Sequence, residues 1–172
     1  MKIETIRVGE LETNCYLVDI NNKVLIIDPG DEFNKIKKQI GNRKVVGVLL
    51  THFHFDHIGA LEEVLSYYKL EVNKVTDSKF KFEIIDTPGH TTESKTYYFV
   101  NDKTMFTGDF IFRDGLGRTD IGGNDEDMIE SLKKIFKYPD DIKIYPGHGE
   151  TSTLGKEKEN YKEYFGWWII RI

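Results

Sequence analysis

Residues Thr51–His57 read Thr-His-Phe-His-Phe-Asp-His and hold three of the five histidines in this chain of 172 residues. Imidazole is the commonest metal-binding side chain at neutral pH. Asp56 adds an oxygen donor that suits the same metals. A hydrogen-bonded core or surface position would account for one such histidine, but not for this concentration of them. The stretch therefore predicts a metal site.

The segments around this stretch predict a chain that mixes strands and helices. Short apolar runs rich in β-branched residues predict strands over 2–8, 14–20, 23–27, 45–50, 80–86, 95–100, 103–107 and 142–145. Apolar residues at helical spacing predict helices over 33–40, over 58–68 and after Asn124, which is a suitable N-cap. The strand over 45–50 leads directly to His52.

Other metal-binding side chains also follow predicted strand ends. His90, Asp109 and His148 each come within a few residues of one, as His52 does. Side chains that follow successive strands meet at one edge of a sheet core. The candidate ligands are His52, His54, Asp56, His57, His90, Asp109 and His148. These are too many for one tetrahedral ion and suit two, with the carboxylate of Asp109 as the natural bridge.

The composition predicts a globular chain with one domain over 1–172, since 39% of the residues are hydrophobic and 31% are charged. A net charge of -5 argues against a nucleic-acid partner. No stretch approaches the roughly 20 apolar residues of a membrane span, and the N-terminus lacks the apolar core of a secretory signal. A cytoplasmic monomer or homodimer without a membrane partner is expected.

Two further features concern packing. Cys15 is the only cysteine, which excludes an internal disulfide and a cysteine-rich zinc site. It falls in a predicted strand and is expected to be a buried thiol. The apolar segment Trp167–Ile172 is expected to dock on the core, with a dimer contact as the alternative.

Four motifs resemble the metallo-β-lactamase superfamily in their order and context: the His-x-His-x-Asp-His string, Pro88–His90, Thr107–Asp109 and Pro146–Gly149. The resemblance implies an α/β (α+β) fold, a four-layer αββα sandwich of two mixed β-sheets flanked by helices, with metals at one edge. It also implies one ion held by His52, His54 and His90, and a second held by Asp56, His57 and His148, with Asp109 shared.

Gly117–Asp120 and Tyr145–Gly149 narrow the resemblance to compact glyoxalase II-like hydrolases. The C-terminal helical region of full glyoxalase II is not expected, because only 24 residues (172 − 148) follow His148. β-Lactamases of this fold usually carry a cysteine where Asp109 stands, so an antibiotic-degrading member is not expected.

The resemblance implies that a hydroxide held by two divalent metal ions attacks the carbonyl of a small thioester or ester. Zinc is the expected metal, with iron and manganese as alternatives, and no organic cofactor is expected. Asp56 and Asp109 would take part in catalysis through the metals. Asp28 and Thr51 would orient the metal ligands by contacting them, without binding a metal ion themselves.

Two other functions stay open. Persulfide dioxygenases of the same superfamily also contain a Gly-Arg-Thr-Asp string, and they use one iron held by residues that correspond to His52, His90 and Asp109. A non-catalytic metal-binding module is a weaker alternative, because such proteins often lose ligands that are all present here. Under each of these functions, Arg118 and Asp120 are expected to pair with each other rather than bind substrate.

Overall fold

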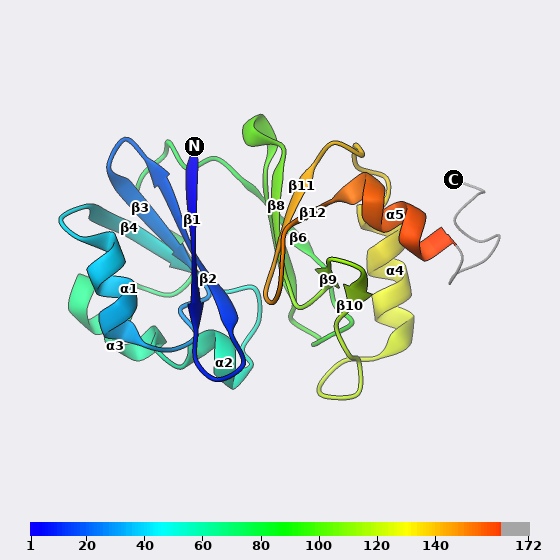
Figure 1. Cartoon of the computed structure of the whole chain (residues 1–172), viewed down its shortest axis with the longest axis horizontal. Coiled ribbons are helices and arrows are strands. Elements are labelled where there is room, and N and C mark those ends of the chain that lie inside the picture. The colour runs from blue at the N-terminus through cyan, green and yellow to red at the C-terminus, as the bar shows by residue number, and fades with distance from the viewer. Residues whose placement is uncertain (163–172) are drawn as a thin grey trace. The chain divides into compact units, whose positions relative to one another are not determined.

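The computed structural model describes residues 1–162. The chain forms two compact units, the first of Met1–Lys81 and the second beginning at Phe82 (Figure 1). Each unit has a β-sheet and a hydrophobic core of its own. Within the described range, no helix has the length and apolar character needed to cross a membrane. The predicted docking of Trp167–Ile172 lies outside the described residues.

The first unit contains a mixed sheet of strand order β1-β2-β3-β4-β5. The strands are β1 Lys2–Val8, β2 Thr13–Ile20, β3 Lys23–Ile27, β4 Lys44–Leu49 and β5 Lys74–Val75. β1, β2 and β3 are antiparallel. Asn21 and Asn22 join β2 to β3 with φ angles of 55° and 61°, a conformation that asparagine tolerates well. β4 runs parallel to β3, so Asp28 and Leu50, just past the two strand ends, lie at the same edge.

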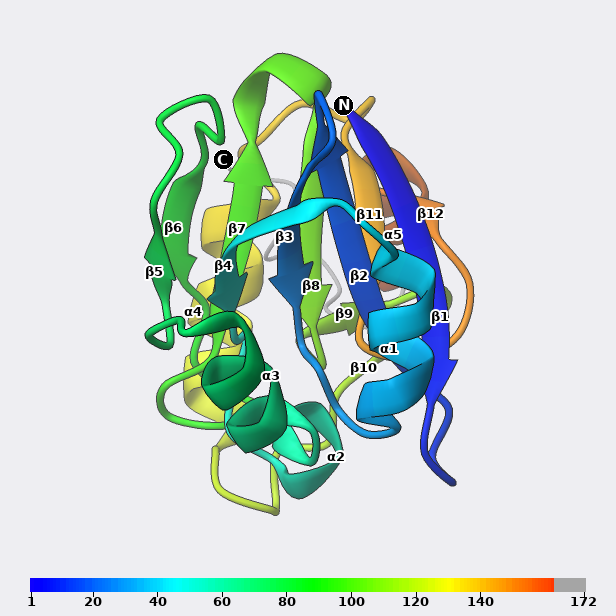
Figure 2. The same cartoon turned by 90° about the vertical axis from the view of Figure 1, so that its left-hand side faces the viewer.

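Helices α1 (Phe33–Ile40), α2 (Phe55–Ile58) and α3 (Leu61–Tyr68) complete the first unit. α1 and α3 lie in front of the sheet in Figure 2. Ile36 of α1 and Val64 of α3 are fully buried in a core that they share with side chains of β1 to β4. Burial of these apolar faces holds the two helices on the sheet.

The helix predicted over 58–68 is wrong at its start, because the structure has two helices separated at Gly59. A Cβ atom at this position would lie 2.3 Å from the carbonyl oxygen of Gly30, so only glycine permits the close approach. The next residue, Ala60, donates a backbone hydrogen bond to the carbonyl of Pro29 at 3.0 Å. These contacts end α2 one turn after it begins.

The second unit contains a mixed sheet of strand order β12-β11-β8-β7-β6 and a short β9–β10 hairpin. The strands are β6 Glu83–Asp86, β7 Lys95–Phe99, β8 Thr104–Gly108, β9 Ile111–Phe112, β10 Gly115–Leu116, β11 Lys143–Pro146 and β12 Ser152–Thr153. β6 and β8 are both antiparallel to β7, and β11 is parallel to β8. β6, β8 and β11 therefore end at one edge, just before His90, Asp109 and His148 respectively.

Helices α4 (Asp125–Ile135) and α5 (Leu154–Lys162) and a 3₁₀ turn (Val100–Asp102, between β7 and β8) complete the described part of the second unit. The side-chain oxygen of Asn124 caps α4 as predicted, by accepting a hydrogen bond from the backbone N–H of Asp127 at 2.8 Å. Both helices contribute to a core with the sheet. α5 is not predicted from the sequence, because it is mostly lysine and glutamate and has little apolar periodicity.

Two mixed sheets with helices against them correspond to the predicted fold class. Four strands are not predicted from the sequence, and each is 2 residues long: β5, β9, β10 and β12. A strand of this length shows no alternating pattern. The single domain expected over 1–172 stays a prediction.

Candidate metal centre

In the first unit, Asp28 holds the ligand segment, Thr51–His57, in place by hydrogen bonds. It follows β3 directly, and its side chain is only 2% exposed. Its Oδ1 accepts a hydrogen bond from the backbone N–H of Thr51 at 2.8 Å, and its Oδ2 accepts one from the Thr51 hydroxyl at 2.6 Å. Oδ2 also lies 3.0 Å from Nδ1 of His57. Since an ionised carboxylate only accepts hydrogen bonds, Nδ1 of His57 carries the proton and Nε2 carries the lone pair.

The same reasoning gives the tautomer of His52. The Thr51 hydroxyl oxygen lies 3.1 Å from Nδ1 of His52, and its own proton is donated to Asp28. The hydroxyl oxygen therefore accepts from Nδ1–H, which places the lone pair of His52 on Nε2. Both rings are buried, where hydrogen bonds decide which nitrogen is protonated.

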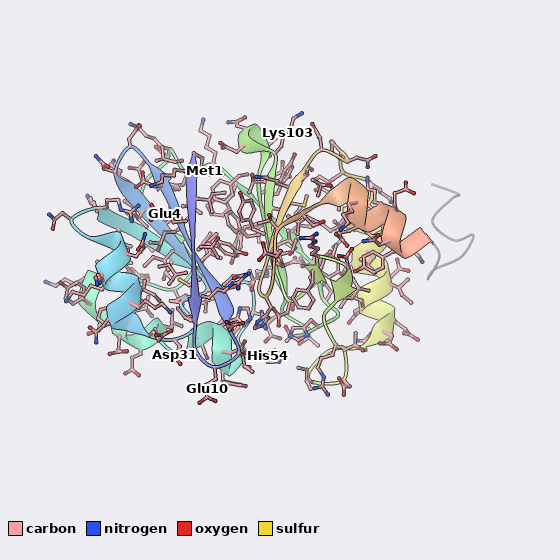
Figure 3. The ribbon with its side chains drawn as sticks, in the orientation of Figure 1. Met1, Glu4, Glu10, Asp31, His54 and Lys103 are labelled. Carbon is pink, nitrogen blue, oxygen red and sulfur yellow. The ribbon has the colours of Figure 1, made fainter. Side chains whose placement is uncertain are left out.

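His54 and Asp56 complete the candidate donors of the first unit. The ring centroid of His52 lies 4.7 Å from that of His54 and 4.1 Å from that of His57, so the three rings form one cluster. His54 is half-buried. It lies just before α2 and is labelled in Figure 3. Oδ2 of Asp56 accepts a hydrogen bond from the hydroxyl of Thr13 at 2.8 Å and lies 3.5 Å from Nε2 of His57. Thr13 is not predicted from the sequence, because a hydroxyl at a strand start carries no spacing signal.

In the second unit, His90, Asp109 and His148 come together although they are far apart in sequence. Oδ2 of Asp109 lies 3.6 Å from Nε2 of His90 and 3.4 Å from Nε2 of His148. The exposed fractions of the three side chains are 3%, 12% and 28% respectively. One carboxylate oxygen thus lies close to a nitrogen of each histidine.

The backbone of the segment after β10 positions His90. Its Nδ1–H donates to the carbonyl oxygen of Arg118 at 2.7 Å, which again leaves the lone pair on Nε2. The contact requires a glycine before it, because a Cβ atom on Gly117 would lie 1.8 Å from the carbonyl oxygen of Asp109. The sequence could suggest the glycine but not the carbonyl contact, which any residue at position 118 could make.

The side chain of Arg118 pairs with Asp120, as predicted. Its Nε and Nη2 each donate to a carboxylate oxygen at 2.7 Å. The hydrogen bonds from Arg118 lower the pKa of Asp120 to about 2. Both side chains are mostly exposed, so the pair adds little to the free energy of unfolding.

The donor atoms of each unit fit transition-metal ions. Two ligand atoms that lie 2.0–2.1 Å from one tetrahedral ion are about 3.3 Å apart. The three nitrogen–carboxylate distances, 3.5 Å for His57 to Asp56 and 3.6 Å and 3.4 Å at Asp109, are close to that value. In His52, His57 and His90 a protein oxygen holds the Nδ1 proton, which is how metal-ligating histidines are usually oriented.

Cys15 adds no donor to this set. It is buried in β2. Burial raises the pKa of its thiol well above the ordinary range, and the charge of Asp28 raises it further. The residue is therefore a neutral structural thiol, as the sequence predicts.

Comparison with known proteins places the chain in a family. The family model of the metallo-beta-lactamase superfamily matches residues 8–75 and 69–148. A probable metallo-hydrolase of Bacillus subtilis, YqgX, is 32% identical, and the match covers 93% of this chain and 96% of the relative. The hydroxyacylglutathione hydrolase GloC of Haemophilus influenzae is 31% identical, with the same two coverages of 93% and 96%.

Solved structures agree with this placement. The crystal structure of the B3 metallo-beta-lactamase BLEG-1 matches with a TM-score of 0.86 and 26% identity, over 92% of this chain and 97% of that one. TTHA1623 in a di-iron-bound form matches with a TM-score of 0.83 and 26% identity, over 91% and 98%. ETHE1 from Myxococcus xanthus matches with a TM-score of 0.81 and 26% identity, over 93% and 83%. The predicted fold class is thereby confirmed, and the chain belongs to the metallo-β-lactamase superfamily.

Proposed function

We propose that the chain is a metal-dependent hydrolase that cleaves the thioester or ester bond of a small molecule, in the manner of glyoxalase II-like enzymes. Membership of a superfamily with metallo-hydrolase relatives supports the hydrolase class. The relative GloC, named a hydroxyacylglutathione hydrolase, supports the thioester bond. The proposed ligands of two metal ions are His52, His54 and His90 for one, Asp56, His57 and His148 for the other, and Asp109 for both.

One observation carries the two-metal proposal. The family resemblance assigns His90 to one ion and His148 to the other. Oδ2 of Asp109 lies 3.6 Å from Nε2 of the first and 3.4 Å from Nε2 of the second. A carboxylate oxygen that lies close to ligands of two different ions suits a residue shared by ions that are typically 3.5–4 Å apart.

The residues of the chain prepare the ligands for this chemistry. Bound metal ions would supply an activated water for attack and would polarise the carbonyl group. Asp28, the Thr51 hydroxyl and the Arg118 carbonyl keep a proton on Nδ1 of His57, His52 and His90 respectively. The Nε2 lone pairs are thereby fixed before any ion arrives, which reduces the reorganisation that binding requires.

The test combines metal analysis with substrate assays on the purified chain. We expect about two transition-metal ions per chain, with zinc as the proposed metal, and hydrolysis of S-lactoylglutathione or a simple thioester. A chromogenic cephalosporin serves as the comparison substrate, and we expect little turnover of it. A single iron with persulfide-dependent oxygen consumption and no thioesterase activity would overturn the proposal.

Persulfide oxidation is the second candidate. It is favoured by the Gly-Arg-Thr-Asp string at Gly117–Asp120 and by the similarity to ETHE1 from Myxococcus xanthus. A one-iron enzyme would use His52, His90 and Asp109. It would not require His148, so a His148→Ala variant separates the two functions. Retained activity in that variant favours the dioxygenase, and lost activity favours the hydrolase.

The remaining expectations from the sequence stay predictions. They are a cytoplasmic location, a monomer or homodimer, and the absence of nucleic-acid and membrane partners. Size-exclusion chromatography with light scattering measures the oligomeric state directly.

A further inference from the structure

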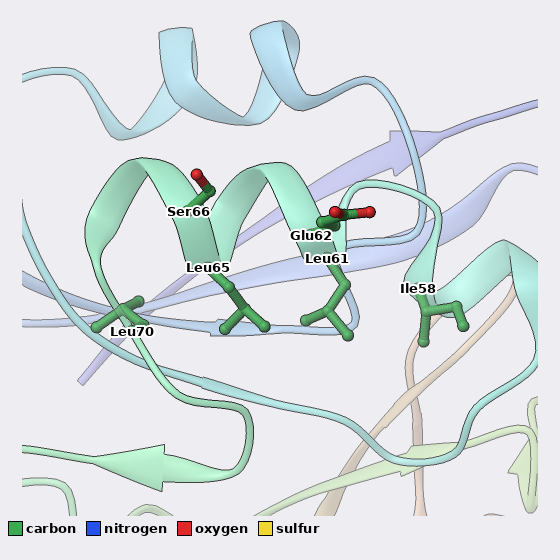
Figure 4. A pocket seen from close by; sticks show the side chains of 6 residues that line it. All are labelled: Ile58, Leu61, Glu62, Leu65, Ser66 and Leu70. Carbon is green, nitrogen blue, oxygen red and sulfur yellow. The ribbon is translucent and has the colours of Figure 1, made fainter.

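A shallow apolar groove lies along α3 in the first unit (Figure 4). It has a volume of about 580 Å³, which is within the usual range for small-molecule sites. Four of its lining residues are aliphatic, and Figure 4 shows them on one side of the helix: Ile58, Leu61, Leu65 and Leu70. All four are half-buried, so their side chains still present apolar surface to solvent.

The groove continues an apolar stripe that starts among the proposed metal ligands. Phe55 stands between His54 and Asp56 in the chain and is 74% exposed. Ile58 follows it by three positions on α2, and Leu61 and Leu65 lie four positions apart on α3, the next helix. Figure 4 shows Ile58 in line with these two leucines. Residues three and four apart lie on the same side of a helix. Ile58 is also the residue directly after His57.

The polar side chains of the groove indicate which kind of molecule it can bind. Glu62 and Ser66, both exposed, are the two polar residues among the six that line it. None of the six is cationic, so the groove offers nothing to pair with the carboxylates or phosphates of an anionic thiol carrier. It offers apolar surface, which stabilises an apolar chain in proportion to the area buried.

We propose that this groove binds the apolar acyl chain of the substrate. The inference rests on the proposed function: Ile58 lines one end of the groove and directly follows His57, one of the proposed metal ligands. An eight-residue helix such as α3 is about 12 Å long, enough for a medium-length chain. The protein should therefore prefer thioesters or esters of medium-length acyl groups over S-lactoylglutathione, whose acyl group is short and hydroxylated.

The first test is a series of thioesters of one small neutral thiol, from acetyl to decanoyl. Full burial of a methylene corresponds to about a fourfold gain in binding, and an open groove should give about half of that free energy. We expect kcat/KM to rise about twofold per methylene up to about eight carbons. A flat profile over the series would contradict the proposal.

The matched variants are Ser66→Trp, which fills the groove, and Glu63→Trp, which places the same side chain at an exposed position of α3 outside the groove. Ser66→Trp should lower the ratio of octanoyl to acetyl kcat/KM about tenfold or more. Glu63→Trp should leave this ratio within about twofold of the wild-type value. Equal losses in both variants would show a general effect on the helix and overturn the assignment.

A binding measurement separates the groove from the reaction. An S-octyl thioether of the same thiol cannot be hydrolysed, and we expect it to shift the NMR signals of the Leu61, Leu65 and Leu70 methyl groups in the wild-type protein. Methyl shifts without hydrolysis of any thioester or ester would uphold the groove and refute the proposed function. Hydrolysis without chain-length dependence and without methyl shifts would refute the groove alone. Methyl shifts that depend on protein concentration, with no added thioether, would identify a second copy as the occupant and overturn the proposal.

Discussion

Replacement of Asp28 by Asn tests how the ligand segment is held. Asn is close in size to Asp, and it tolerates the φ angle of 52° found at this position. In the native chain the carboxylate accepts three hydrogen bonds, two from Thr51 and one from His57. An amide has one oxygen and one NH₂ group. Its NH₂ group must therefore face a group that donates a hydrogen bond to the native carboxylate.

Each orientation of the amide disturbs the centre. If the NH₂ group replaces Oδ2, Nδ1 of His57 must become an acceptor, and the proton moves to the nitrogen that should bind metal. If the amide is flipped, the backbone N–H of Thr51 faces a donor. The side chains of His57 and position 28 are 0% and 2% exposed, so water cannot relieve the conflict. Metal affinity should fall about 10–100-fold, or about 1.4–2.7 kcal/mol.

The assay is metal titration in competition with a chelator of known affinity, together with long-range ¹H–¹⁵N spectra that report imidazole tautomers. Asp31→Asn is the control, since Asp31 is an exposed carboxylate in the same loop whose Oδ1 accepts instead from the backbone N–H of Glu32. An Asp28→Asn protein that binds metal within about threefold of the wild type and keeps the Nδ1–H form of His57 would refute the reasoning.

Three further predictions follow from the structure. Asp109→Ala should abolish hydrolysis and reduce the metal content below two ions per chain with an unchanged circular dichroism spectrum, and normal turnover would refute the bridge. The hydrogen bond from Gln39, reinforced by those from Lys2 and Arg43, lowers the pKa of Glu4 to about 2 in the folded chain. A lowered carboxyl pKa stabilises the fold above the unfolded-state value, so the free energy of unfolding should lose about 1–3 kcal/mol as the pH falls from about 5 to 2. Glu4→Gln should flatten that pH dependence in urea titrations, and an unchanged slope would refute it. Cys15 should resist a thiol reagent in the folded protein and react once the chain is unfolded in urea; rapid labelling of the native thiol would count against its burial.

The sequence predicted best what depends on side-chain type and local spacing. The strands before His52 and Asp109 follow from apolar runs, and the candidate ligands follow from their chemistry. The break at Gly59 depends on a carbonyl oxygen 29 positions earlier in the chain, at Gly30, so no local pattern reveals it. The partner of Asp56, the Thr13 hydroxyl, is likewise set by the pairing of distant segments. The periodicity of apolar residues in the sequence does not predict tertiary contacts of this kind.

The contact between His90 and the Arg118 carbonyl has a consequence for how such proteins diversify. Every amino acid supplies the same backbone oxygen, so the orientation of this ligand does not depend on the side chain at position 118. Mutations can therefore change what the neighbouring loop recognises while the imidazole keeps its direction. A scaffold with this property can acquire new substrates by exchanging loop side chains, while the orientation of the metal ligand stays the same.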